Sequence, residues 1–73
     1  MTRFRVTTDW WIPQTFDTSD EALKYGMSVV YMSDNEFLRK KALLDAGKAV
    51  WFAYGFSEVS IEPISDELQE KAA

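Results

Sequence analysis

The alternation of apolar and polar residues predicts two strands, one near each end of the chain. In residues 3–11 every second side chain falls on one largely apolar face, which comprises Phe4, Val6, Thr8 and Trp10. Residues 56–64 repeat the pattern, with apolar residues alternating against an acidic and hydroxyl face until Pro63. We expect Pro63 to end this strand, because proline donates no ladder hydrogen bond. After Pro13, Gln14 to Phe16 are a candidate for a short return strand.

Two capping patterns predict two helices in the middle of the chain. Thr18 is followed three residues later by Glu21, and Ser33 is followed at the same spacing by Glu36. A hydroxyl residue and an acid at this spacing satisfy free N–H groups at a helix start. The first helix should run to about Met32, with an apolar stripe of Ala22, Leu23, Met27 and Val30 and with Gly26 allowing close approach. The second should begin at Asp34 and stop near Gly47.

Residues 49–54 are compatible with two structures. Their apolar density is typical of a buried strand, whereas their alanines and the sequence Tyr54-Gly55-Phe56 are typical of a helix closed by a glycine cap. We favour the helix and keep the strand as the alternative. Residues 65–73 are expected to add one or two helical turns at most.

These elements together predict a single α+β domain spanning residues 1–73. Its core should be a small antiparallel sheet of two to three strands, in which the 3–11 strand pairs with the 57–63 strand. Two to three helices should pack on one face of this sheet. A domain of this length buries only about 60% of its unfolded surface, so its stability should be modest unless a partner adds to it.

Aromatic residues exceed what so small a core hides easily. The chain carries 11 aromatic residues (3 Trp, 3 Tyr and 5 Phe). Neighbouring residues of a strand point to opposite faces, so Trp11 should share the polar face with Arg5 and Asp9. Because interfaces use such side chains as anchors, we predict a contact patch of Trp11, Trp51 and Phe52, ringed by the acids Asp9, Glu58 and Glu62.

Residue types that carry chemistry are scarce, and this favours a protein that is not an enzyme. There is no histidine and no cysteine, so disulfides, thiolate zinc sites and the commonest general base are excluded. Acids such as Asp17, Asp20 and Asp34 sit where helix starts favour them, and the three isolated glycines form no phosphate-binding loop. We expect no catalytic residue, no metal site and no cofactor.

Charge and hydropathy narrow the range of partners. The net charge is −4, from 8 bases and 12 acids, which makes nucleic acid an unlikely partner and suits contact with a basic surface. The exception is the basic run Arg39-Lys40-Lys41, which with Lys48 lies close to Trp51 in sequence. No apolar run is long enough to span a membrane, and the first residues lack the apolar core of a signal peptide. We therefore expect a cytoplasmic protein.

Two stretches resemble parts of small bacteriophage-encoded inhibitors of host proteins. Residues 16–23 (FDTSDEAL) and 55–63 (GFSEVSIEP) are similar to the helix entry and the closing strand of the T7-type inhibitor of bacterial RNA polymerase. That closing strand carries arginines where this chain has Ser60 and Glu62. The resemblance implies a compact protein that docks on a host enzyme, a polymerase or a CRISPR effector and blocks it.

Residues and resemblance together favour a small, acidic, non-catalytic inhibitor that binds a host or bacterial protein in the cytoplasm of the host cell. Two alternatives stay open. The same aromatic patch would serve a structural or regulatory homodimer, and residues 39–54 would serve single-strand nucleic-acid binding, where cations and stacking aromatics act together.

Overall fold

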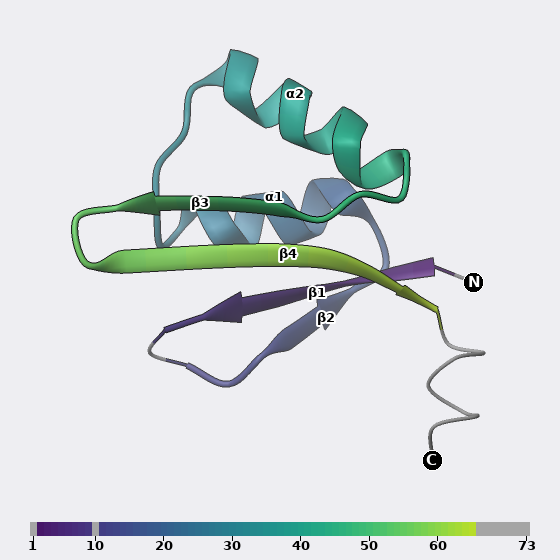
Figure 1. Ribbon diagram of the computed structural model, residues 1–73, viewed down its shortest axis with the longest axis horizontal. Coiled ribbons are helices and arrows are strands. Elements are labelled where there is room, and N and C mark those ends of the chain that lie inside the picture. The colour runs from purple at the N-terminus through teal and green to yellow at the C-terminus, as the bar shows by residue number, and fades with distance from the viewer. Residues whose placement is uncertain (1, 10, 66–73) are drawn as a thin grey trace.

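The computed structural model describes residues 2–9 and 11–65, and these residues form four strands and two helices. The elements are β1 (Thr2–Thr8), β2 (Gln14–Phe16), α1 (Ser19–Met27), α2 (Asp34–Asp45), β3 (Val50–Tyr54) and β4 (Ser57–Ser65). All strand pairs are antiparallel, and the strand order is β2-β1-β4-β3 (Figure 1). The α+β class is confirmed, with one strand more than the two to three expected. The helix proposed for residues after Ser65 lies outside the described part of the chain.

The two strands predicted from alternation form the centre of the sheet. β1 pairs with β4 along its whole length, from Thr2 opposite Ser65 to Thr8 opposite Val59. On its other side β1 pairs with the short return strand β2. β1 ends at Thr8, so Trp11 lies in the connection to β2 and not on the strand.

The prediction of a helix at 49–54 is wrong, because this segment is the edge strand β3. Tyr54 pairs with Ser57, which leaves Gly55 and Phe56 as a two-residue turn. Gly55 has φ of +63°, a value that suits the first position of a tight hairpin turn and that glycine adopts without strain. The glycine that favoured a helix cap therefore closes a hairpin, and this adds the fourth strand.

Pro63 does not end β4, contrary to expectation, and its position explains why it is tolerated. β4 continues to Ser65, with Pro63 opposite Phe4 of β1. On the other side β3 begins only at Val50, opposite Ile61. Pro63 therefore has a strand on one side only, which is the edge situation in which a missing N–H group breaks no ladder.

Both predicted helix starts are confirmed. The Thr18 side chain accepts a hydrogen bond from the backbone N–H of Glu21 at 3.1 Å, and Ser33 does the same for Glu36 at 3.3 Å. The first helix ends at Met27 instead of Met32. The residues that follow it leave the helix but still supply Val30 and Met32 to the core. No helix in the described residues is long and apolar enough to cross a membrane.

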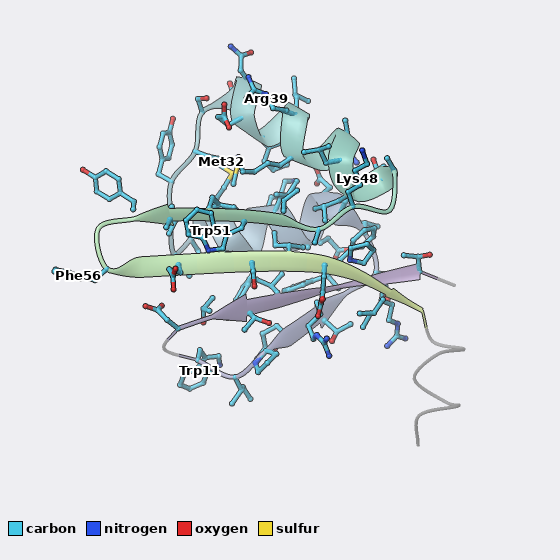
Figure 2. All side chains as sticks on the ribbon, viewed as in Figure 1. Trp11, Met32, Arg39, Lys48, Trp51 and Phe56 are labelled. Carbon is cyan, nitrogen blue, oxygen red and sulfur yellow. The ribbon has the colours of Figure 1, made fainter. Side chains whose placement is uncertain are left out.

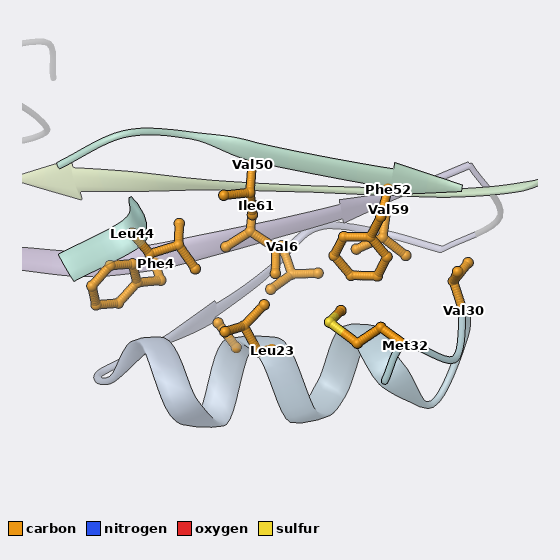
Figure 3. Packing of buried hydrophobic residues seen from close by; sticks show 11 residues of the cluster. Phe4, Val6, Leu23, Val30, Met32, Leu44, Val50, Phe52, Val59 and Ile61 are labelled. Atoms are coloured by element: carbon orange, nitrogen blue, oxygen red, sulfur yellow. The ribbon is translucent and has the colours of Figure 1, made fainter. Parts of the chain in front are cut away.

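The hydrophobic core lies between one face of the sheet and the helices (Figure 3). Its strand residues alternate in register, with Val6, Val59 and Ile61 fully enclosed. The other buried apolar residues are Phe4, Ala22, Leu23, Val30, Met32, Leu44, Val50 and Phe52. A Cβ atom at Gly26 would lie 2.8 Å from Phe52 Cζ, so α1 approaches the sheet as closely as glycine permits. The close approach expected for Gly26 is thereby confirmed.

Candidate binding surface

The face of the sheet opposite the core, here called the open face, carries the side chains left over by the alternation. All of them are exposed or half-buried. They are Arg3, Arg5, Thr7, Thr15, Trp51, Ala53, Glu58, Ser60, Glu62 and Ile64. Most are polar or charged, so the one large aromatic side chain among them, Trp51, stands out. Figure 2 labels Trp51 on β3, where it is the second residue of the strand.

Trp51 forms one wall of a hollow of about 150 Å³, which we call the Trp51 pocket. Its lining residues come from the end of β1 with the residue that follows it, from the first half of β4 and from β3, and they are Thr7, Thr8, Asp9, Trp51, Glu58 and Ser60. The register explains this gathering, because Thr7 and Trp51 are both opposite Ser60, and Ala53 is opposite Glu58. Three of the predicted site residues, Asp9, Trp51 and Glu58, are therefore neighbours.

The two acids of the Trp51 pocket differ from Glu62 in their partners. Among the described residues, neither Asp9 nor Glu58 makes an ion pair or a side-chain hydrogen bond. Glu62 differs, because it accepts a hydrogen bond of 2.9 Å from Arg5 Nε and pairs with that guanidinium across the open face. Of the three predicted acids, Glu62 is therefore paired with a cation, whereas Asp9 and Glu58 make no ion pair among the described residues.

Phe52 is a correction to the predicted patch. As part of β3 it points to the face opposite Trp51, where it is 8% exposed and belongs to the core. The Lys40 ammonium lies 5.8 Å from the centre of its ring. Adjacent residues of a strand face opposite sides, so Trp51 and Phe52 cannot belong to one surface.

Trp11 lies apart from the Trp51 pocket. It is exposed in the connection between β1 and β2 and does not line the pocket. Phe56, fully exposed at the tip of the β3–β4 turn, lies at the same end of the sheet in Figure 2. Phe56 and the neighbouring exposed Tyr54 were missed from the sequence, since Gly55 was interpreted as a helix cap with an apolar residue packed after it. The pair Gly55-Phe56, interpreted as the two residues of a hairpin turn, would have predicted that Tyr54 and Phe56 are exposed.

The basic run of α2 is largely neutralised within the helix. Arg39 and Lys40 both pair with Glu36, and Lys41 pairs with Asp45. The hydrogen bond from Lys40, followed by the charges of Lys40 and Arg39, lowers the pKa of Glu36 below its usual range. These cations stabilise the local structure of α2. The helix α2 packs on the core side of the sheet, whereas Trp51 projects from the opposite face.

The pKa of Asp45 is lowered by a contact that joins the two helices. Ser19 Oγ donates a hydrogen bond of 2.7 Å to Asp45 Oδ1, and this is the largest cause, followed by the hydrogen bond from Lys41. Lys41 Nζ also donates to Ser19 Oγ at 3.1 Å. The described residues contain no group of three or more acids that would hold a metal ion.

Comparisons of the chain with family models, with curated proteins and with solved structures find no match.

Proposed function

We propose that this protein is a non-catalytic binding domain that docks on another protein through the open face around Trp51. The observation that carries the proposal is the indole of Trp51, which is 61% exposed on a sheet face and flanked by Asp9 and Glu58. The core supports the proposal by contrast, because it buries Phe52 on the same strand. Trp51 is therefore a large apolar side chain of β3 that the fold leaves to solvent on the open face.

Burial of an exposed tryptophan is a strong source of affinity. Tryptophan is among the residues that dominate binding energy, and truncation of such an anchor costs on the order of 2 kcal/mol or more. The acids around it would act mainly on association rate and on the choice of partner, by attracting a basic surface. Trp11 and Phe56, at the end of the sheet where the pocket lies, extend the apolar area available to a partner.

The finer proposal, which rests on the resemblance to phage inhibitors, is that the partner is a bacterial host or defence protein and that docking blocks it. The two stretches that carry the resemblance form the entry to α1 and the strand β4 with its preceding turn. β4 supplies Glu58 and Ser60 to the Trp51 pocket. A blocking protein needs no chemistry of its own, since it acts by occupying a surface.

The test compares Trp51→Ala with a control of equal exposure. Leu38 on α2 is 63% exposed, so Leu38→Ala removes a similarly exposed apolar side chain elsewhere. Tagged wild-type protein and both variants are used to capture partners from bacterial lysate, with far-UV circular dichroism to verify the fold. We expect a specific captured protein to be lost with Trp51→Ala and kept with Leu38→Ala. Retention of every captured protein by folded Trp51→Ala would refute the proposed surface.

Nucleic-acid binding is less well supported. The cations of the basic run Arg39-Lys40-Lys41 are paired with acids of their own helix, and the acids near Trp51 in space would repel phosphate. A homodimer would use the same open face or the outer edge of β3. Sedimentation at micromolar concentration tests that alternative, and a monomer would leave the surface available to a different protein.

A further inference from the structure

The outer edge of β3 carries backbone groups with no partner strand. β3 is the last strand of the sheet, and the Tyr54–Ser57 pair closes a two-residue turn. In such a hairpin the closing pair is hydrogen-bonded and the pattern then alternates. Trp51 and Ala53 therefore direct their N–H and C=O groups away from β4. Within the described residues, no backbone hydrogen bond connects this edge to another element.

This edge lacks the usual protection against strand pairing. Proteins block exposed edges with charged residues, proline, bulges or very short strands. Residues 50–54 (VWFAY) contain no charged residue, no proline and no glycine. The opposite edge strand, β2, has three residues and directly follows Pro13. The β3 edge is thus the longer and more apolar of the two edges of the sheet.

The Trp51 pocket lies beside this edge and has the composition of a site for a cation. Ala53 of the edge strand β3 is opposite Glu58 of β4. Its methyl group is too small to cover the Glu58 carboxylate from the open side of the edge. Glu58 and Asp9 make no ion pair within residues 2–9 and 11–65, and the indole of Trp51 offers a face for a cation–π contact.

We propose that the partner adds an extended segment to β3 as a fifth strand and that this segment places an arginine or lysine beside Ala53. The inference rests on the proposed function and specifies the partner's chemistry. A strand added to β3 lies about 10 Å from β4, which is two strand spacings. A long basic side chain that reaches over Ala53 from the added strand can meet the Glu58 side chain that extends from β4. Backbone hydrogen bonds to Trp51 and Ala53 give affinity, and the pocket selects the cation.

A second copy of this chain fits the same edge less well. If two β3 strands paired around a two-fold axis, each Ala53 would face a residue of the partner's 50–54 segment. That segment contains no base, so Asp9 and Glu58 would stay uncompensated. The charges of the pocket therefore favour a basic segment from a different protein.

The probes are synthetic nine-residue peptides of alternating threonine and valine with arginine, norleucine or glutamate at the central position. Binding is followed by chemical-shift titration of the full chain, and strand addition by hydrogen exchange of the Trp51 and Ala53 amides. We expect the arginine peptide to slow exchange at both amides. It should bind about tenfold more tightly than the norleucine peptide, equivalent to about 1.4 kcal/mol, and this preference should shrink as salt is added.

Variants separate the contribution of the pocket from that of the edge. Glu58→Gln should remove most of the preference for arginine over norleucine, whereas Glu62→Gln, whose acid is paired with Arg5, should preserve it. Ala53→Pro removes an N–H group that does not take part in the ladder with β4 and should abolish binding of every peptide. If Ala53→Pro fails to fold, Ala53→Arg provides the second test, because its own guanidinium should occupy the pocket and weaken the arginine peptide.

Several outcomes would overturn the inference. They are no binding of any peptide at millimolar concentration, equal affinity for the three central residues, or protection that omits Trp51 and Ala53. Protection that grows with protein concentration in the absence of peptide would assign the edge to a second copy instead. Failure here combined with Trp51-dependent capture of a protein leaves the proposed function standing. Retention of every captured protein by folded Trp51→Ala, combined with intact peptide binding, refutes the proposed function alone.

Discussion

The two faces of the sheet are built from the same strands but follow different rules. Phe52 and Trp51 are neighbours in β3, yet one is 8% exposed and the other 61%. On the covered face, side chains from all four strands pack into the core or against it, and α1 approaches as closely as Gly26 permits. On the open face, polar side chains surround one tryptophan and a hollow. The first face specifies the fold, and the second is free to specify a partner.

The difference shows why a count of aromatic residues does not locate a binding surface. Trp51 and Phe52 are both large, apolar and adjacent, and their composition cannot distinguish them. The pleat of β3 assigns one to each face, because side chains alternate along a strand. What remains exposed then depends on which face α1 covers.

The largest effect should come from the neighbouring residues Phe52 and Trp51. Phe52→Ala should lower the free energy of unfolding by about 3–5 kcal/mol, since it leaves a cavity under α1. This is comparable to the whole stability expected for a domain of this size, on the order of 5 kcal/mol. Trp51→Ala should change it by only about 0.5–1 kcal/mol. Urea unfolding of both variants measures the difference, and equal losses would contradict the assignment of the two faces.

Gly26→Ala tests how tightly the covered face is packed. The new methyl group would meet Phe52 Cζ at 2.8 Å and Val59 Cγ1 at 3.1 Å, so we expect a loss of about 1–3 kcal/mol in the free energy of unfolding. The same substitution in a Phe52→Leu background should cost less, because the ring that it meets is gone. A fully additive double mutant would show that the contact with Phe52 is not the cause.

Thr8 and Thr7 are adjacent residues on opposite faces of β1, and both can be replaced by valine. The hydroxyl of Thr8 is buried without a partner among the described residues, so Thr8→Val should raise the free energy of unfolding by about 1 kcal/mol. Thr7 is exposed, and Thr7→Val should have an effect near zero. Thermal unfolding compares the two variants. A destabilised Thr8→Val protein would show that the hydroxyl has a partner in solution.

The ion pair between Arg5 and Glu62 should contribute little, although it is a prominent contact of the open face. Both side chains are about half exposed, and exposed pairs are worth roughly 0–1 kcal/mol. Glu62→Gln should therefore lower the free energy of unfolding by less than about 0.5 kcal/mol, with a smaller difference at 1 M salt. A loss as large as that of Gly26→Ala would mean that the open face also stabilises the fold.

A small pH dependence should come from α2. The pKa values of Glu36 and Asp45 are lower in the folded chain than their usual values. Their contribution to stability is therefore fully present above the unfolded-state pKa and is lost as the pH falls through the folded-state pKa, below about pH 4. Ser19→Ala should raise the pKa of Asp45, because it removes the largest cause of the shift. Carboxyl chemical shifts followed by NMR measure this, and an unchanged pKa would exclude the Ser19 contact as the cause.

Local signals determined most of the framework. Thr18 and Ser33 fixed both helix starts, since a cap needs only a hydroxyl at the right spacing from an N–H group. The alternation around Val6 and Ile61 identified the two central strands, because period-two patterns survive wherever one face is buried. Asp9, Trp51 and Glu58 were named from sequence as site residues, and the structure places them around one pocket.

Other features depended on contacts between distant segments. Residues 49–54 are apolar enough for either a helix or a strand, and pairing with β4 made them a strand. That pairing removed Phe52 from the predicted patch and placed Glu58 beside Ala53. β4 continues through Pro63 because β3 begins only at Val50, opposite Ile61, and so does not reach Pro63. No local pattern encodes this circumstance.

The sequence by itself determined the class of fold, the helix starts and a surplus of aromatic residues, because these depend on neighbours a few positions away. The tertiary structure decided which of two adjacent aromatics is exposed, which acids lack a cation and where an unpaired edge lies. Each of these depends on strand register and on the side of the sheet that α1 covers. Register is set by the whole sheet at once, and a shift of one residue would exchange the two faces of a strand.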